Sequence, residues 1–376
     1  MNPYYFDYNA TTPLVPEAFR AMEPFLKEQF GNPSSTHAMG KAAERAVGIS
    51  RRQVACLIGA SDDREVVFTS GGTESNHTAI RSALEASEGR KKIVTSTVEH
   101  SSVRKLCDRL EKEGYEVCRI PVDRDGALSL PDFRRALDGR TAVVTLMMAN
   151  NESGVIFPVA EWAEWVKACG SFFHVDAIQA PGKLALDVAR SGADFISFAA
   201  HKCYGPKGVG ALYVRHETKL NPLFWGGAQE RGRRAGTENV AGIVGFGAAC
   251  EWAGKGLEQA LRDIRTLRDR FEDEITRKIP GSVVQGRRSE RLPNTSLITF
   301  TGIDAEALLY ALDQKNICVS MGSACLSGSN EPSHVLTAMG ASEEEAKSSL
   351  RFSFGRMTHE TEVTHLIAAL VEWIKP

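Results

Sequence analysis

The sequence predicts an α/β fold in which helices cover both faces of a largely parallel sheet. The first observation is the alternation of short β-rich runs with helical patterns from about residue 65. It is typical of parallel sheets, because a helix usually connects two parallel neighbours. The second is the length of 376 residues, enough for one large domain and a smaller one. The third is an ordinary globular composition, with 43% hydrophobic and 24% charged residues.

The strands and helices of the large sheet are expected in regular order. Residues with high β-propensity mark strands at 65–69, 91–96, 115–121, 141–148, 171–176, 193–200 and 208–215. Helical periodicity marks one segment opening at Thr73 and two others at 102–114 and 159–170. The middle of the chain is therefore predicted to be α/β.

The last third of the chain has a different pattern. Segment 256–280 carries charges at helical spacing, which is typical of a solvated helix face. Short strands at 282–286, 294–302 and 316–321 then mix with helices at 305–315, 342–350 and 360–375. This mixture predicts a smaller α+β domain after the large one.

The composition argues against several classes of partner. The 45 basic and 47 acidic side chains nearly cancel, so neither nucleic acid nor an anionic membrane is expected to bind. The N-terminal stretch MNPYYFDYNATTP lacks the basic and apolar regions of a secretory signal, and no apolar run approaches a membrane span. We therefore expect a cytoplasmic protein. The eight cysteines contain no C-x-x-C pair, so neither a metal site nor a disulfide framework is expected.

Polar residues follow four of the predicted strands, at the positions where open α/β sheets bind ligands. Gly71 and Gly72 precede a helix with Thr73 in its first turn, and the N–H groups there would attract an anion. An ordinary helix cap explains the same residues. Asn150 and Asn151 could hold a ring substituent or a carboxylate, and a turn explains them equally well.

The other two strand ends carry groups with more specific chemistry. Asp176 ends an apolar strand, where a carboxylate should be exposed, paired or reactive. His201 and Lys202 follow strand 193–200, and a lysine there is a candidate nucleophile or base, with a surface lysine as the alternative. An anion cradle, a carboxylate and a lysine are together the minimum set for pyridoxal phosphate. That cofactor needs a phosphate site, an acid beside its ring nitrogen and an amine for its aldehyde.

One cysteine lies in a stretch of unusual composition. The stretch VSMGSACLSGSNEPSHVL, residues 319–336, surrounds Cys325 with glycine and small polar residues. Such a run predicts a surface loop, so the thiol is expected to be accessible, whereas structural cysteines are usually buried. Cys325 is either an incidental loop thiol or a reactive one, because reactivity depends on a lowered pKa that no sequence shows directly.

Ordered motifs cover nearly the whole chain and suggest a family. They are FDYNATTP, FGNPSSTH, TSGGTESN, VEHSSV, NNESG, HVDAIQ, HKCYGPKGVGALYVR, GGAQERGRRAGTENV, GSACLSGSNEPSHVL and LRFSFGR. With these motifs the chain resembles the cysteine desulfurases (NifS/IscS type) of the class V aminotransferase superfamily. The resemblance implies fold type I, with a mainly parallel seven-stranded sheet in a large domain, 16–257. Residues 1–15 and 258–376 would form the small domain, which carries a mobile catalytic-cysteine loop at about 321–333.

The resemblance also implies roles for individual residues. By it, Lys202 forms the internal aldimine with pyridoxal phosphate, Asp176 pairs with the ring nitrogen and Gln179 hydrogen-bonds the ring hydroxyl. His100 would stack on the ring and assist proton transfer, and Cys325 would attack the sulfur of the bound cysteine. The implied cofactor-binding residues are Gly72, Thr73, His100, Asn151, Asp176, Gln179, His201, Lys202 and Thr237, with Thr237 reaching across from a second subunit to the phosphate. Asn151 and Arg351 would hold the substrate carboxylate, a task that suits a planar guanidinium.

The implied function is removal of sulfur from L-cysteine, giving L-alanine and a persulfide on Cys325. The protein would be a homodimer, and its sulfur would pass to an iron-sulfur scaffold or another acceptor protein. Two alternatives remain open. One is a selenocysteine lyase or another class V enzyme on the same fold, and the other is a non-catalytic sulfur carrier or scaffold.

The chain departs from the family pattern at a few positions. Ala199 stands where many relatives have a phosphate-binding serine, and His77 stands where an asparagine is common, so groups around the cofactor are expected to differ. Leu326 and Asn330 replace a frequent threonine and leucine, which would affect partner docking more than chemistry.

Three further residues are expected to have structural roles. Cys203 should face away from the cofactor, because neighbouring side chains on an extended segment point to opposite faces. Cys318 lies in an apolar run and is expected to be buried. His174 is expected to be a satisfied histidine beside the core.

Overall fold

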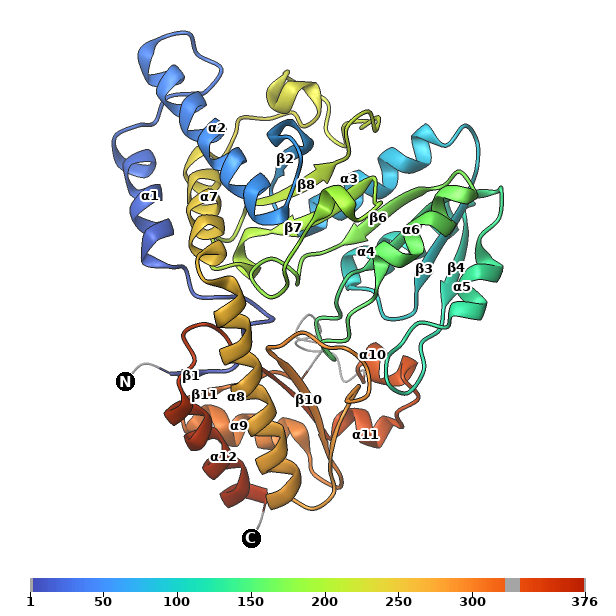
Figure 1. Cartoon of the computed structure of the whole chain (residues 1–376), viewed down its shortest axis with the longest axis vertical. Helices are drawn as coiled ribbons and strands as arrows, with labels where there is room; N and C mark the ends of the chain where they lie inside the picture. The colour runs from blue at the N-terminus through green and yellow to red at the C-terminus, as the bar shows by residue number, and fades with distance from the viewer. Residues whose placement is uncertain (1–2, 322–331, 375–376) are drawn as a thin grey trace.

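The computed structural model describes residues 3–321 and 332–374, and a seven-stranded sheet lies at the centre of its larger body (Figure 1). The strands are β2 (Val66–Thr69), β3 (Lys92–Ser96), β4 (Glu116–Ile120), β5 (Thr141–Met147), β6 (Phe172–Asp176), β7 (Phe195–Ala199) and β8 (Gly210–Val214). Their order is β2-β8-β7-β6-β5-β3-β4. Strand β8 runs antiparallel to both neighbours, and the other pairs are parallel. The predicted mainly parallel sheet is confirmed.

Helices cover both faces of this sheet, which explains its apolar strands, since each strand is buried on two sides. Side chains of α2 (Ala38–Ile58), α5 (Leu130–Ala136), α6 (Val159–Ala168) and α7 (Val240–Gly254) share one core with one face. Those of α3 (Gly72–Ala86) and α4 (Ser101–Lys112) share a second core with the other. Helix α1 (Pro16–Lys27) packs against α7. Short 3-10 turns occur at Asp63–Glu65, Val188–Arg190, Ala200–Lys202 and Gln229–Gly232.

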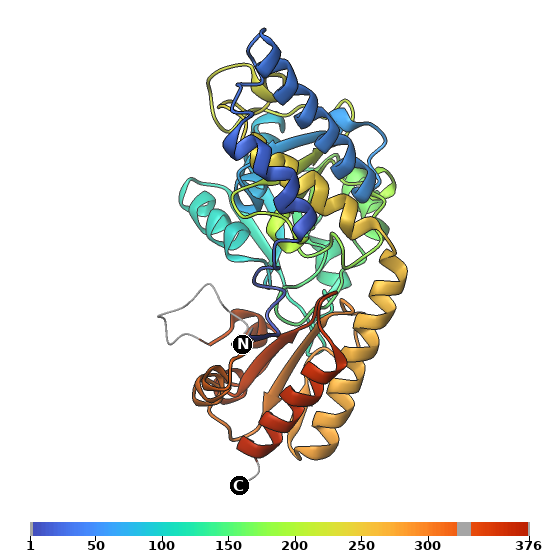
Figure 2. The same ribbon diagram turned by 90° about the vertical axis from the view of Figure 1, so that its left-hand side faces the viewer.

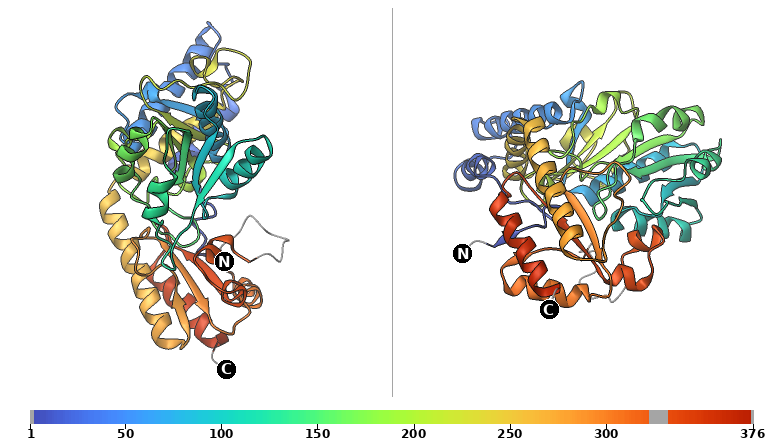
Figure 3. Two further views of the ribbon diagram at one scale, coloured as in Figure 1. Left: turned by 90° about the vertical axis from the view of Figure 1, so that its right-hand side faces the viewer. Right: turned by 60° about the horizontal axis from the view of Figure 1, so that its bottom comes forward.

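A smaller body lies below the large sheet, and Figure 2 shows α8 running down one side of it. Its strands are β9 (Ser282–Val284), β10 (Thr295–Phe300) and β12 (Ser349–Ser353), joined antiparallel in the order β12-β10-β9, and a parallel pair, β1 (Tyr4–Tyr5) and β11 (Ile317–Cys318). Its helices are α8 (Leu257–Lys278), α9 (Ala305–Gln314), α11 (Glu343–Lys347) and α12 (Glu360–Ile374). Both views in Figure 3 place α8 and α12 on the same side of this body.

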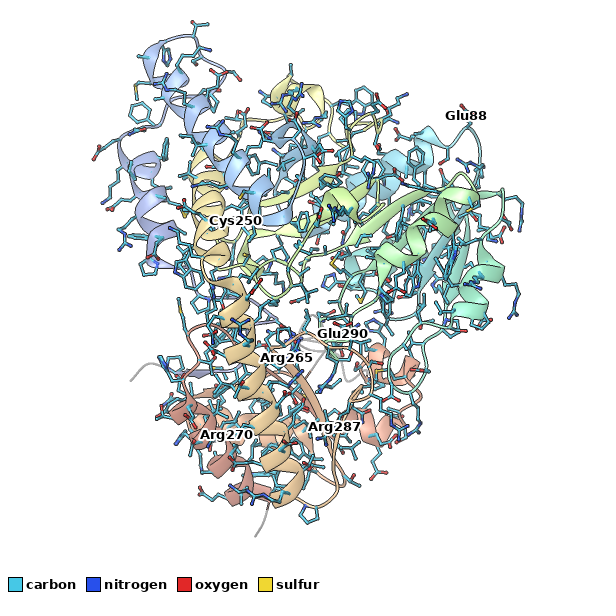
Figure 4. All side chains as sticks on the ribbon, viewed as in Figure 1. Glu88, Cys250, Arg265, Arg270, Arg287 and Glu290 are labelled. Atoms are coloured by element: carbon cyan, nitrogen blue, oxygen red, sulfur yellow. The ribbon has the colours of Figure 1, made fainter. Side chains whose placement is uncertain are left out.

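The charge pattern of α8 has the predicted explanation. Arg265 is exposed and Arg270 is partly exposed along this helix (Figure 4), whereas Phe271 and Ile275 are buried in the core of the small body. Most of the charged residues therefore form the solvated face of an amphipathic helix, whereas Arg268 and Glu272 are buried.

Two details bear on the predicted domain division, which stays a prediction. Phe6 lies in the core of the small body, as expected if residues 1–15 belong to it. Helix α10 (His334–Ala338), by contrast, contributes Val335 to the core of the large body. Helix α10 therefore packs against the large body, whereas the core residues of α9 and β12, which flank it in sequence, lie in the small body.

The strand predicted at 316–321 is shorter than expected, and the prediction that Cys318 is buried was wrong. Strand pairing extends only over Ile317–Cys318, and the Cys318 side chain is half-buried. The reason is that β11 belongs to a two-stranded pair with β1 alone, so neighbouring strands do not enclose it. Within the described ranges, no helix combines the length and the apolar character needed to cross a membrane.

Candidate active site

A cavity of about 440 Å³ lies beside the carboxyl ends of β5, β6 and β7. Its lining also includes the N-termini of α3 and α4, strand β12 and the N-terminal segment. The structure brings together these residues predicted from the sequence: Gly72, Thr73, His100, Asn151, Asp176, Gln179, His201, Lys202 and Arg351. The cavity lies where doubly covered sheets bind ligands, because strand ends and helix N-termini meet there.

Lys202 enters the cavity from a 3-10 turn, Ala200–Lys202, that directly follows β7. Its Nζ donates hydrogen bonds to the main-chain oxygens of Asn9, at 2.6 Å, and Ala10, at 2.8 Å. The next residue, Cys203, is fully buried and does not line the cavity, as predicted. The reason given for that prediction was wrong, because the segment is a tight turn and not an extended strand.

Asp176 ends β6 and is buried at the floor of the cavity. One carboxylate oxygen accepts a hydrogen bond from Asn76 Nδ2 at 2.7 Å, and the other accepts one from the main-chain N–H of Ile178 at 3.0 Å. Burial raises the pKa of Asp176, while His100 and the hydrogen bonds oppose that rise. A buried carboxylate held in this way is suited to a cationic partner in the cavity.

His100 caps the N-terminus of α4, with its Nδ1 accepting from the main-chain N–H of Ser102 at 3.1 Å. Asn76 Nδ2 donates to Ser102 Oγ at 2.9 Å as well as to Asp176. Ser102 Oγ lies 2.9 Å from His100 Nδ1, so Asn76 is linked to the imidazole through the Ser102 hydroxyl group. The sequence reasoning missed this residue, although it ends the quoted motif TSGGTESN.

The N-terminus of α3 forms the anion-binding end of the cavity. Helix α3 begins at Gly72, one residue before the predicted start. A Cβ atom placed on Gly72 would lie 2.2 Å from the Ile178 side chain, so the backbone approaches its neighbour too closely for any other residue to fit without a shift. Burial and nearby lysines lower the pKa of His201 to about 4, so its imidazole is neutral near pH 7. Thr73 and His201 therefore offer uncharged hydrogen-bonding groups at this end.

Arg351 crosses from β12 of the small body to the large one and is almost fully buried. Its Nη2 donates to Asp7 Oδ1 at 2.6 Å, and its Nη1 donates to the main-chain oxygen of Asn151 at 3.0 Å. These bonds hold the guanidinium in one orientation at the cavity wall, which favours recognition of a carboxylate.

The two asparagines after β5 have different environments. Asn150 is buried, and its Oδ1 accepts from the main-chain N–H groups of Glu152 and Ser153, so the turn explanation holds for it. Asn151 lines the cavity. Only the second of the pair is placed to contact a ligand there.

Two residues singled out from the sequence lie elsewhere. Thr237 lines a separate cavity of about 120 Å³ with Ser70 and Arg234, and does not reach the site of its own chain. Cys325, with Leu326 and Asn330, lies outside the described residues. Within the described part of the chain, no group of His, Cys, Asp and Glu side chains could hold a metal ion.

The structure shows the surroundings of Ala199 and His77, which depart from the family pattern, and of His174. Ala199 lines the cavity and offers no hydroxyl group there. His77 Nε2 lies 3.1 Å from the main-chain oxygen of Ser102, so it contacts the segment that carries His100. His174 is buried between Thr145 Oγ1 and Ser197 Oγ, at 2.8 and 2.9 Å, and burial lowers its pKa to about 3. It is the satisfied structural histidine that was predicted.

Glu99 is a buried acid that the sequence reasoning missed, although it precedes His100 in the motif VEHSSV. Its Oε1 accepts from Ser96 Oγ at 2.6 Å and from the main-chain N–H of Met147 at 3.1 Å. Burial, with repulsion from Asp176, raises the pKa of Glu99 to about 8. Glu99 is therefore neutral at pH 7.

The raised pKa of Glu99 predicts a pH dependence of stability. The unfolded carboxyl group releases its proton near its usual pKa of 4.5, and the folded one near 8. Between these values the folded state binds more protons, so this group's contribution to the free energy of unfolding falls as pH rises. We expect the melting temperature of Glu99→Gln relative to wild type to increase from pH 5 to pH 8. The exposed control Glu164→Gln should show no such trend, and a constant difference for Glu99→Gln would contradict the prediction.

Comparisons with known proteins identify the family of the chain. The family model "Aminotransferase class-V" matches residues 4–366. A cysteine desulfurase of Cereibacter sphaeroides is 50% identical over 371 residues, which cover 98% of this chain and 95% of that protein. A solved NifS-like protein is 34% identical with a TM-score of 0.91, covering 100% of this chain and 99% of that one. The solved structure of SspA in complex with cysteine is 33% identical with a TM-score of 0.81, and the match covers 94% of this chain and 99% of that one.

These matches span nearly the whole length of this chain and of each similar protein, and the fold is that of the pyridoxal-phosphate enzymes of fold type I. The chain therefore belongs to the class V aminotransferase family. Within that family it is an enzyme of the cysteine desulfurase group, in agreement with its relatives at 46–50% identity.

Proposed function

We propose that the chain uses pyridoxal phosphate in this cavity to convert L-cysteine to L-alanine, with the sulfur leaving as a persulfide on Cys325. The observation that carries the proposal is the meeting of an amine, a buried carboxylate and a buried guanidinium at one cavity, on Lys202, Asp176 and Arg351. The relative solved with cysteine supports the choice of substrate.

The residues of the cavity fit this cofactor. The close approach at Gly72 leaves backbone N–H groups at the start of α3 for a phosphate, with Thr73 and neutral His201 beside them. Asp176 would pair with the ring nitrogen. Lys202 Nζ would hold the aldehyde carbon and Gln179 would bond the ring oxygen.

The reaction needs contributions from both bodies of the chain. When bound, pyridoxal phosphate supplies an electron sink for the α-carbon of the substrate. Arg351 and Asn151 would bind the substrate carboxylate, and Lys202 Nζ would take the α-proton, with His100 assisting. The thiolate of Cys325 would take the substrate sulfur, so that L-cysteine and one thiol give L-alanine and one persulfide. An added thiol then reduces the persulfide and restores Cys325.

The test is alanine release from L-cysteine by the protein reconstituted with pyridoxal phosphate. With excess dithiothreitol we expect continuous release of alanine and sulfide. Without a reductant, alanine should stop near one equivalent per chain, because the persulfide on Cys325 remains. A visible absorption band without alanine release would argue for another reaction of this family, and a colourless protein would contradict the cofactor assignment.

We also propose that the chain works as a homodimer. The N-terminal part of the large body exposes Leu26 and Phe30, with 63% and 77% of their surfaces accessible, and Trp225 is 85% accessible. Such apolar exposure is typical of a surface covered in an assembly. In a dimer Thr237 would reach the phosphate of the partner's site. A solution mass of twice 41.0 kDa is expected from light scattering, and a mass of one chain would contradict the proposal.

The destination of the sulfur is proposed from the sequence. The GSAC pattern around Cys325 resembles the relatives that pass sulfur to proteins, so we propose an iron-sulfur scaffold or another acceptor protein in the cytoplasm. Transfer of ³⁵S from labelled chain to a purified scaffold protein would test it, and labelling of small thiols alone would count against it.

A further inference from the structure

Lys183 is a buried lysine that the proposed reaction does not use. Only 6% of its surface is accessible, and it does not line the cavity. It follows Gln179 by four residues, in the turn after β6. Its Nζ donates to Asn9 Oδ1 at 3.0 Å and to Gln179 Oε1. Both acceptors are carbonyl oxygens of buried amides.

These two amides hold the groups that face the cavity. The main-chain oxygen of Asn9 accepts from Gln179 Nε2 at 3.0 Å and from Lys202 Nζ at 2.6 Å. Asn9 Nδ2 donates to the main-chain oxygen of Asn151 at 3.1 Å. Lys183 therefore binds Gln179 directly. Through Asn9 it is also linked to Lys202 and Asn151.

The hydrogen bonds of Lys183 fix which way the Gln179 amide points. Because Oε1 accepts from a lysine, Nε2 must occupy the other position, against Asn9 and the cavity. One N–H of Nε2 is used by Asn9, and among the described residues no acceptor is found for the other. That N–H group remains for a ligand in the cavity. If the amide were reversed, an oxygen would face the ligand instead.

The surroundings of Lys183 fit the same arrangement. Both groups that accept hydrogen bonds from its Nζ are uncharged carbonyl oxygens. Burial and the neighbouring cations Lys202 and Arg351 lower the pKa of Lys183 well below its usual value, whereas Asp7 and Cys203 act weakly in the opposite direction. Asn294 Nδ2 also donates to Asn9 Oδ1, so that oxygen receives two donors. Lys183 therefore bridges two buried amides, those of Asn9 and Gln179.

We propose that Lys183 is a positioning residue that presents a Gln179 N–H group to the ring oxygen of the cofactor and holds the Asn9 carbonyl against Lys202. This inference rests on the proposed use of pyridoxal phosphate. A hydrogen-bond donor to that ring oxygen stabilises its anionic form, and so lowers the pKa of the cofactor's link to Lys202. Loss of Lys183 should raise that pKa and weaken cofactor binding without removing any group that touches the cofactor.

The test compares Lys183→Met with Lys92→Met. Lys92 is also buried and donates to Asp138 at 2.9 Å. It is the first residue of β3, however, and so lies at the opposite end of the parallel strands from the cavity. For each protein reconstituted with pyridoxal phosphate, the pH midpoint of the visible absorption band and the cofactor Kd are measured. For Lys183→Met we expect a midpoint higher by about half a pH unit or more and a Kd raised about tenfold, the usual effect of leaving a buried acceptor unpaired. Lys92→Met should keep the wild-type midpoint and Kd, although it is expected to unfold at a lower temperature.

A second comparison asks whether Lys183 acts through Gln179. The double variant Lys183→Met/Gln179→Met should have the same midpoint as Gln179→Met alone, because the amide that Lys183 orients is then absent. Additive shifts would overturn the proposal, as would a wild-type midpoint and Kd in Lys183→Met. If Lys183→Met does not fold, Lys183→Gln replaces it. Its amide ends one atom short of the lysine nitrogen, so a raised midpoint is again expected and a wild-type midpoint overturns the proposal. A wild-type protein without a visible band would instead refute the cofactor assignment.

Discussion

The Cys325→Ala protein is expected to release no alanine from L-cysteine beyond background, while keeping the visible absorption band of the wild-type protein. The described chain supports this expectation on both sides of residues 322–331. Before them, Ser320 exchanges main-chain hydrogen bonds with Arg351 at 2.7 and 3.2 Å. After them, Ser333 Oγ donates to Glu152, which lines the cavity. Both ends of the stretch that carries Cys325 are therefore held beside the cavity, as an attack on bound substrate requires.

Cys318→Ala is the matched control, because Cys318 is half-buried and lies seven residues before Cys325. It should retain wild-type alanine release. Equal turnover by both variants would remove Cys325 from the mechanism and favour the selenocysteine lyase alternative, in which no loop thiol takes sulfur. Loss of the absorption band in Cys325→Ala would indicate a structural effect, so the band is measured on the same samples.

Local patterns were sufficient to predict the large sheet and the strand ends that carry its chemistry. Asp176 and Lys202 could be found because one ends and the other closely follows a largely apolar strand, and ligands bind at the carboxyl ends of such strands. The start of α3 was likewise visible in the two glycines before Thr73. The short strand β11 was harder to predict, since an apolar run does not reveal how many neighbours its strand will have.

The residues that hydrogen-bond these cavity residues could not be predicted from local sequence patterns. Asn9 and Lys202 are 193 positions apart, yet they share a hydrogen bond of 2.6 Å. Asn9, Lys183 and Glu99 lie in or next to motifs that suggested the family, but no local pattern assigns their contacts. Their roles follow from burial, because a buried amine or acid must find partners, and those partners come from whatever segments the fold brings near.

The segment that carries Thr237 is fixed to its own large body. The cavity of Thr237 lies beside Glu230, whose carboxylate forms a buried bidentate ion pair with Arg51, at 2.6 Å for each bond. Arg234 in the same segment binds Glu74 in the first turn of α3. These contacts hold the segment in place within its own chain, as the proposed contact of Thr237 with a second subunit would require.

The Lys202→Ala protein is expected to lose alanine release by on the order of 10³-fold or more, because it lacks the amine that we propose both holds the cofactor and accepts the proton. Its cofactor should be removed by dialysis, and its absorption maximum should match that of pyridoxal phosphate bound without a covalent link. The main-chain oxygens of Asn9 and Ala10 would also lose their donor, so a small decrease in melting temperature is expected.

Lys207→Ala is the control for this variant, since Lys207 is an exposed lysine five residues further along the same segment. It should release alanine at the wild-type rate and retain the cofactor on dialysis. Alanine release by Lys202→Ala at the wild-type rate would contradict the assignment. The three lysines of this region have different surroundings. Lys202 lines the cavity, Lys183 is buried outside the cavity lining, and Lys207 is exposed to solvent. Activity should therefore depend on Lys202 directly, on Lys183 through the amides it orients, and on Lys207 not at all.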